Sequence, residues 1–110
     1  MRQRLVILES PYAAPTPEEV RENEAYARLA LKDSLERGEA PIASHLLYTQ
    51  VLDDRIPEER TMGINAGLAW RLVADASVVY VDRGMSRGMI FGVELAEAQG
   101  IPIEYRRILP

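Results

Sequence analysis

The sequence predicts a small α/β domain with a parallel sheet, because short apolar runs alternate with longer segments of helical periodicity. Arg4–Leu8 and Ser77–Val81 are the clearest buried strands, since each is a short run rich in aliphatic residues that ends at a polar loop. Strands that alternate with helices form parallel sheets through right-handed crossovers. We therefore expect a doubly wound, Rossmann-like or flavodoxin-like sheet of about four to five strands with helices on both faces.

Cap and breaker residues indicate where the other elements begin and end. Thr16, Pro17 and Glu19 form a capping box with proline at the first helical position, and Pro57 begins another helix. Gly100, followed by Ile101-Pro102, ends a third helix. We expect strands at residues 4–8, 40–43, 77–81 and 103–105, helices at residues 17–37, at residues 86–99 and from residue 57 onward, and one or two helical turns between residues 45 and 55.

Apolar residues recur at helical spacing in the first long helix and are expected to pack one stripe of it on the sheet; they are Val20, Ala27, Leu31 and Leu35. The helix that begins at Pro57 carries Ile64, Leu68, Leu72 and Val73, with Glu58 and Glu59 at the positive end of its dipole.

Length and composition limit the classes of protein that the chain can represent. Its 110 residues suit one domain, which we place at residues 1–110. A net charge of −4 argues against nucleic-acid binding, and no apolar run is long enough to cross a membrane. The chain has no cysteine and a single histidine, His45, so we expect neither a metal site nor a cofactor. These features favour a cytoplasmic protein that recognises a small molecule.

In doubly wound sheets, ligands bind outside the carboxyl ends of the strands, where the strand order reverses. Two loops are therefore the expected binding region. One contains Ser10, Pro11 and Tyr12, and the other runs from Asp82 to Gly88. The second loop leads into a helix at Ser86-Arg87-Gly88-Met89, where free N–H groups, a hydroxyl and the helix dipole favour an anion such as phosphate.

Each of these residues also has a purely structural interpretation. Ser86 is equally suited to cap its helix, and Tyr12, which is placed to stack on a base or bind a sugar hydroxyl, also fits a cover for the core edge. His45 is either a structural hydrogen-bond partner or a catalytic group. Asp82 suits a ribose hydroxyl or proton transfer, and also a turn cap. Candidate phosphate-binding arginines are Arg83, Arg87, Arg106 and Arg107.

Several stretches along nearly the whole chain together resemble one family. They are Leu8–Ala13, Ser44–Asp54, Glu59-Arg60, Gly63, Gly67–Trp70, Ser86–Met89 and Gly100–Pro102. These motifs are similar to a branch of small proteins in the nucleoside 2-deoxyribosyltransferase-like superfamily, related to the 2′-deoxynucleoside 5′-monophosphate N-glycosidases. The resemblance implies a doubly wound fold, a homodimer or higher homo-oligomer with shared pockets, sugar contacts at Tyr12, and a 5′-phosphate held by Ser86 and Gly88.

The resemblance also implies a nucleophilic glutamate that this chain lacks. In the family this residue lies six positions after the serine and eight before the glycine of Gly-Ile-Pro, which here is Gly92. Glu94 points roughly 200° around the helix from that position, so its use as nucleophile requires a register shift. We expect Gly92 to enlarge the pocket where the glycosidic bond would lie. Close approach of backbone or ligand, or drift after loss of activity, would explain a glycine inside a helix.

Three hypotheses follow for the function. The first is a catalytically silent protein that binds a nucleotide-derived small molecule, for example a phage protein that sequesters an immune signal through Ser10, Pro11, Tyr12, His45, Asp82, Ser86, Arg87, Gly88, Met89 and Gly92. The alternative is a nucleoside or nucleotide N-glycosidase, or a deoxyribosyltransferase, that uses Glu94 with help from Asp82. The third is a structural or regulatory domain with a vestigial pocket.

Overall fold

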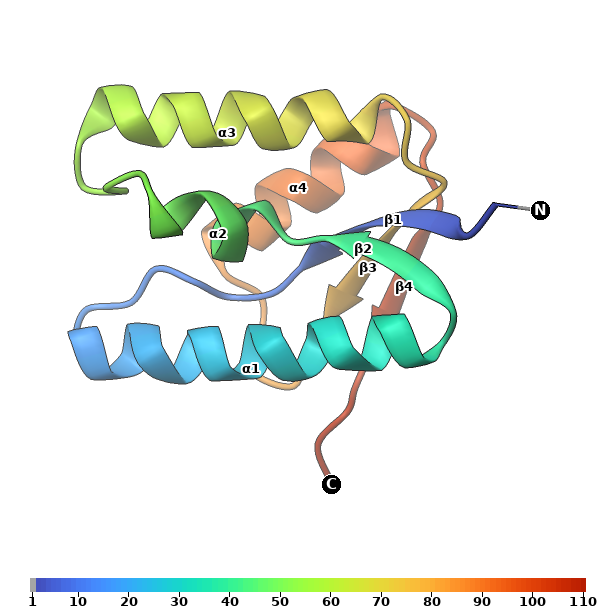
Figure 1. Cartoon of the computed structure of the whole chain (residues 1–110), viewed down its shortest axis with the longest axis horizontal. Coiled ribbons are helices and arrows are strands. Elements are labelled where there is room, and N and C mark those ends of the chain that lie inside the picture. Colours follow the sequence, from blue (N-terminus) through green and yellow to red (C-terminus); the bar gives the residue numbers. More distant parts are fainter. Residues whose placement is uncertain (1) are drawn as a thin grey trace.

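The computed structural model describes residues 2–110 and contains one parallel sheet with helices on both faces (Figure 1). The strand order is β2-β1-β3-β4. After β2 the chain crosses to the other side of β1, so the order in which strands are added to the sheet reverses at that point. The strands are β1 (Arg4–Glu9), β2 (Glu39–Ile42), β3 (Ala76–Tyr80) and β4 (Ile103–Arg106). The helices are α1 (Pro17–Glu36), α2 (Ser44–Leu47), the 3-10 helix η1 (Tyr48–Gln50), α3 (Pro57–Arg71) and α4 (Arg87–Ala98). The predicted fold class is confirmed.

Alternation along β3 separates two layers of core. Val78 and Tyr80 face α1 and pack with the buried α1 residues Tyr26 and Ala27. Val79 faces the opposite way and packs against α4. Figure 1 shows the same arrangement, with α1 on one side of the sheet and α3 and α4 on the other. Period-two alternation in a strand buried on both faces therefore positions α4, which supplies one wall of the candidate site.

The capping box that predicted the start of α1 is present. The Thr16 hydroxyl accepts a hydrogen bond from the backbone N–H of Glu19 at 3.2 Å, and Pro17 is the first helical residue. Of the predicted stripe of α1, Ala27 is buried and Leu31 packs against the core, but Leu35 is 57% exposed. The helix also buries Asn23, Tyr26, Ala30 and Ser34. Small side chains on this stripe let the helix lie close to the sheet.

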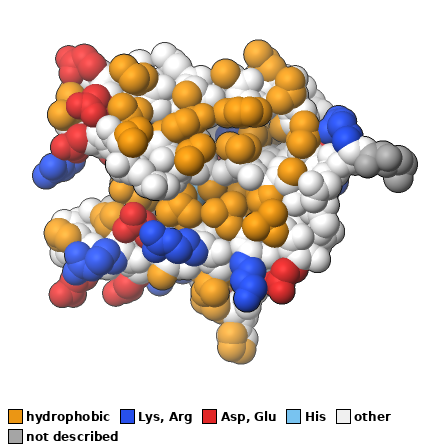
Figure 2. Space-filling model, in the orientation of Figure 1, with side chains coloured by type: hydrophobic (Ala, Val, Ile, Leu, Met, Phe, Trp, Pro, Cys, Tyr) orange, Lys and Arg blue, Asp and Glu red, His pale blue; other side chains and the backbone are white. Residues whose placement is uncertain are grey.

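The apolar residues in and just after α3 are largely exposed. Leu72 and Val73, just beyond its last residue, are 80% and 55% exposed, and Ile64 is 42% exposed. The residue of α3 that is buried is Arg71. The helix packs against α2 and borders the cavity described below, which Ile64 and Leu68 line. Figure 2 shows hydrophobic side chains gathered on the surface over α3.

A buried ion pair joins the two edge strands. Glu39 of β2 accepts hydrogen bonds from both terminal nitrogens of Arg106 in β4, at 2.8 and 2.7 Å, and one from the Ser34 hydroxyl at 2.7 Å. These bonds, led by those from Arg106, lower the pKa of Glu39 to about 2. Arg106 also donates to the Tyr80 hydroxyl at 3.0 Å. Arg106, a candidate phosphate-binding residue, is therefore engaged in the core.

The described part of the chain, residues 2–110, contains no helix that is both long and apolar enough to cross a membrane.

Candidate small-molecule binding site

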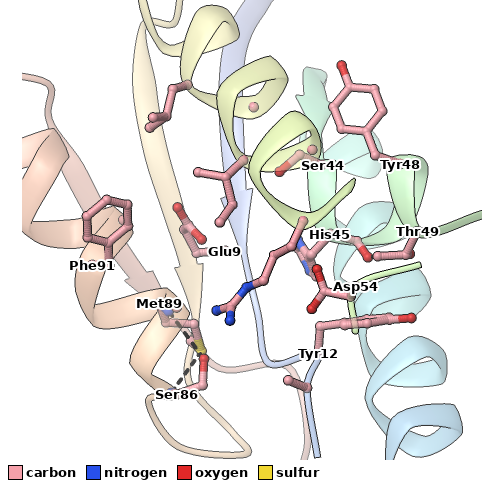
Figure 3. Close-up of a pocket in the computed structure, with 18 of the residues that line it drawn as sticks. Glu9, Tyr12, Ser44, His45, Tyr48, Thr49, Asp54, Ser86, Met89 and Phe91 are labelled. Atoms are coloured by element: carbon pink, nitrogen blue, oxygen red, sulfur yellow. Dashed lines mark hydrogen bonds between the residues drawn. The ribbon is translucent and has the colours of Figure 1, made fainter. Parts of the chain in front are cut away.

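A cavity of about 740 Å³ lies beyond the carboxyl end of β1, between α4 on one side and the α2–α3 segment on the other. Its volume is within the range of roughly 300–1,000 Å³ that is typical of small-molecule sites. Residues of the loop after β1 and of the helix that follows β3 both line it, as the topology predicted. Figure 3 shows Met89 and Phe91 of α4 facing His45, Tyr48 and Thr49 across this space.

Most of the predicted site residues meet in this cavity. Those that line it are Ser10, Tyr12, His45, Ser86, Arg87, Gly88, Met89 and Gly92. Three predicted residues, Pro11, Asp82 and Glu94, are not among the lining residues. The topology thus brings together the two predicted loops, but not every residue on them.

The hydrogen-bond partners of Asp82 are residues that do not line the cavity. Its carboxylate accepts a hydrogen bond from the Tyr26 hydroxyl at 2.6 Å and further bonds from the backbone N–H groups of Ile108 and Leu109. These bonds lower the pKa of Asp82 in spite of its partial desolvation. Asp82 therefore anchors the C-terminal segment, and a role for it in proton transfer has no support in this geometry.

Glu94 is exposed on the outer side of α4, while Gly92 is buried on the inner side. The helical rotation of roughly 200° between the two positions accounts for this difference. A glycosyl transfer through Glu94 would need α4 to turn by about 160° around its axis. The structure gives no support to the alternative hypothesis.

The end of β1 carries a hydrogen-bonded pair at the cavity wall. The Ser10 hydroxyl lies 2.7 Å from Nε2 of His45, and the Thr49 hydroxyl donates to the His45 carbonyl at 2.7 Å. Burial lowers the pKa of His45 to about 4, so the imidazole is neutral at pH 7. A neutral ring leaves one nitrogen able to accept and one able to donate. His45 therefore has a structural hydrogen-bond partner and also borders the cavity.

A second pair in the cavity, Glu9 and Arg71, was not predicted from the sequence. The Arg71 guanidinium donates to Oε2 of Glu9, and the two side chains are only 6% and 13% exposed. They lie directly on Gly92, where an added Cβ would come within 2.7 Å of Nη2 of Arg71. The expectation that Gly92 enlarges the pocket is therefore wrong, because this ion pair fills the space.

A weak sequence signal for the pair exists. Glu9 is a charged residue directly at the end of an aliphatic strand, the place where doubly wound folds bind ligands. Arg71 looks like an ordinary basic residue in the last turn of a helix, where it complements the helix dipole. Its partner is distant in sequence, so local patterns give no indication of the contact.

The N-terminus of α4 presents polar groups to the cavity. Ser86 is the N-cap, and its hydroxyl accepts a hydrogen bond from the N–H of Met89 at 3.2 Å. Ser86 therefore caps the helix, which leaves the N–H groups of Arg87 and Gly88 without a hydrogen-bond partner among residues 2–110. The exposed residues Arg87 and Gly88 also line the cavity at this point.

Two arginines of the cavity carry no ion pair with any described residue. Arg87 lies at the start of α4, and Arg60 lies on the opposite wall in α3. Neither forms a side-chain hydrogen bond or salt bridge within residues 2–110, whereas Arg55 binds Asp53 and Arg71 binds Glu9. Unpaired guanidinium groups at a cavity provide ready partners for carboxylate or phosphate oxygens.

Close packing between α2 and α3 forms the remaining wall. Gly67 lies so near Ser44 that an added Cβ would be 2.8 Å from the Ser44 hydroxyl oxygen. The Trp70 indole donates to the Tyr48 hydroxyl at 2.9 Å, which fixes the Tyr48 ring. Together with Tyr12 and Phe91, Tyr48 gives the cavity three aromatic side chains.

The fold and the cavity define a doubly wound α/β domain with a ligand-sized space at its topological switch point. The chain belongs to the family described as domain of unknown function DUF7768, whose model matches residues 4–106. No curated protein and no solved structure matches the chain.

Proposed function

We propose that this protein binds a phosphorylated, nucleotide-derived small molecule and leaves it intact, as a capture or sensor protein does. The observation that carries the proposal is the composition of the cavity. Arg60 and Arg87, which form no ion pair within residues 2–110, share it with the N-terminus of α4 and with three aromatic side chains. A nucleotide has the matching chemistry, an anionic group joined to an aromatic ring.

The anionic end of the ligand is assigned to α4. Free N–H groups at a helix N-terminus and the helix dipole stabilise negative charge, and Arg87 adds a full positive charge beside them. Arg60 approaches from α3 on the far wall, so a phosphate would be held from two sides. One acidic residue of the cavity, Glu59, already accepts a hydrogen bond from the backbone N–H of Asp53 at 2.9 Å.

The ring of the ligand is assigned to the aromatic side chains. Figure 3 shows Tyr12 below His45 and Asp54, with its ring edge-on in this view. Aromatic rings stack on nucleobases regardless of the base, with a contribution of about 1–3 kcal/mol per base. Tyr12 and Tyr48 are both half-buried, so part of each ring remains available to a ligand.

Binding without turnover is proposed because the expected nucleophile is missing and no replacement takes its place on α4. Gly92 has no side chain, and Glu94 is exposed away from the cavity. Three carboxylates border the cavity. Glu9 is held by Arg71, Glu59 accepts a hydrogen bond from the backbone N–H of Asp53, and Asp54 lies exposed on the opposite wall from α4.

We also propose that the chain forms a homo-oligomer through the apolar surface over α3. Met62 and Trp70 of α3, and Leu72 just after it, are 59%, 45% and 80% exposed. Figure 2 shows hydrophobic side chains gathered over this helix. Patches of this kind mark contact surfaces. Light scattering should show an oligomer for the wild type and a smaller species for Leu72→Glu, because the added charge disrupts the apolar contact. A monomeric wild type would contradict the proposed homo-oligomer.

Equilibrium dialysis tests the binding proposal. The probes are a defined set of nucleoside mono-, di- and triphosphates, cyclic dinucleotides and ADP-ribose. We expect at least one of them to be retained, and to bind about tenfold more weakly to Arg60→Gln and to Arg87→Gln, since each removes a charge-assisted hydrogen bond. Arg28→Gln, exposed on α1 across the sheet, is the matched control. Retention of none, or equal binding by all variants, would contradict the proposal.

A further inference from the structure

The Glu9 carboxylate has one occupied and one free oxygen. Oε2 accepts from Arg71, whereas no donor within residues 2–110 forms a hydrogen bond to Oε1. The side chain is 13% exposed, and Glu9 is among the residues that line the cavity. Figure 3 shows its carboxylate between Phe91 on one side and His45 and Asp54 on the other. A carboxylate oxygen without a donor among the described residues therefore lies in the wall of the cavity.

The surroundings of Glu9 make a free acceptor costly once a ligand has displaced water. Ile7, Leu68 and Phe91 are among the apolar residues that line the same cavity. Desolvation raises the pKa of Glu9, and the charge of Arg71 only partly opposes this effect. A ligand that expels water without replacing its hydrogen bond loses affinity. A ligand that fits this cavity must therefore carry a donor at Glu9.

The position of Glu9 along α4 indicates which donor it meets. Glu9 contacts Gly92, six residues after the N-cap Ser86, which corresponds to roughly 9 Å along a helix that rises 1.5 Å per residue. This separation is comparable to the span of one sugar phosphate. With the phosphate at the start of α4, the group at Glu9 is the sugar ring, and the donors of a sugar ring are its hydroxyls.

We propose that Oε1 of Glu9 accepts a hydrogen bond from a sugar hydroxyl of the ligand, and that the cavity thereby selects ribonucleotides over deoxyribonucleotides. This inference rests on the proposed function and adds the sugar class to it. Arg71 acts as a positioning residue, because it holds Oε2 and turns Oε1 toward the cavity. Gly92 acts in the same way by leaving room for the pair.

Glu9→Gln tests the inference sharply, because Arg71 determines how the amide is oriented. Glu9 is the one acceptor that Arg71 binds among the described side chains, and Nη1 of Arg71 has no partner in residues 2–110. The amide oxygen should therefore remain on Arg71, which places the NH₂ group where Oε1 was. The substitution exchanges an acceptor for a donor at constant shape.

The experiment measures binding of the four ribonucleoside 5′-monophosphates and of their 2′-deoxy and 3′-deoxy counterparts by calorimetry. For the wild type, we expect at least one deoxy series to bind about tenfold more weakly than the ribonucleotides. For Glu9→Gln, the preference should shrink to about twofold or less. Glu94→Gln, which replaces an exposed glutamate outside the cavity, is the control and should keep the full preference.

The outcomes separate the inference from the function on which it rests. Equal binding of all three series by the wild type would overturn the inference while leaving nucleotide binding intact. A Glu9→Gln variant that keeps the wild-type preference would overturn it as well. The wild-type comparison is decisive even where Glu9→Gln does not fold. Failure of every monophosphate and of the wider nucleotide set to bind would overturn the proposed function and the inference together.

Discussion

The carboxylate of Glu9 occupies the space in which a side chain at position 92 would begin, so Glu9 and Gly92 depend on each other. An added Cβ at Gly92 would lie 2.8 Å from Cδ of Glu9 and 2.7 Å from Nη2 of Arg71. Real Cβ atoms do not approach other heavy atoms this closely. Glycine inside α4 is thus explained by the close approach of an ion pair from β1 and α3.

Gly92→Ala should lower the free energy of unfolding by about 2 kcal/mol. Alanine gains about 1 kcal/mol of helix propensity, but displacement of a buried ion pair costs about 3 kcal/mol or more. Urea denaturation measures the difference. Gly88→Ala in the same helix is the control, because its added Cβ would meet Ser86 at 3.9 Å, which is an ordinary contact. A Gly92→Ala variant as stable as Gly88→Ala would contradict the mutual dependence.

Glu39→Gln should destabilise the fold by about 3 kcal/mol, because it leaves the buried charge of Arg106 without its principal partner. The pKa of Glu39 is held at about 2, below the usual value of 4.5, so its contribution is present above pH 4.5 and is lost as the pH falls toward 2. Denaturation between pH 7 and pH 3 should therefore show a smaller acid loss in Glu39→Gln than in the wild type. Glu104→Gln, 40% exposed, should have a smaller effect at neutral pH. Equal effects of the two substitutions would argue against the buried pair.

His45 should make the stability of the fold depend on pH in a different range from Glu39. Burial lowers its pKa to about 4 from 6.5, so the unfolded chain binds a proton that the folded chain does not between these values. Stability should therefore decrease as the pH falls from 6.5 to 4, by up to roughly 3 kcal/mol. His45→Gln, which can still bind Ser10, should show a smaller decrease over this window. An unchanged pH profile in His45→Gln would mean that the imidazole is not held neutral.

Local signals in the sequence were sufficient to predict most of the fold. The capping box of Thr16 and Glu19 marked the start of α1, and the run Ser77–Val81 marked β3 to within one residue. The packing face of α1 was harder, because Leu35 has the apolar character of a core residue but is exposed. Which stripe of a helix is buried depends on its height and rotation above the sheet, and these are set by partners distant in sequence.

The candidate site could be predicted in part for a related reason. Strand order places the loops of Tyr12 and Ser86 together, and helical geometry correctly turned Glu94 away from Gly92. The Glu9–Arg71 pair links residues 62 positions apart, and no periodicity or motif connects them. Asp82 follows the end of β3, where a ligand-binding residue is expected, but backbone N–H groups of the C-terminal segment bind its carboxylate.

The central claim, intact binding of a nucleotide-derived molecule, is tested most directly by mass spectrometry of the purified protein after incubation with the defined nucleotide set. The ligand released on denaturation and any free base in solution are quantified in the same sample, for the wild type and for Glu94→Ala. We predict a stoichiometric amount of intact ligand in both proteins and no free base. Free base beyond one equivalent that disappears in Glu94→Ala would contradict the claim and establish an N-glycosidase.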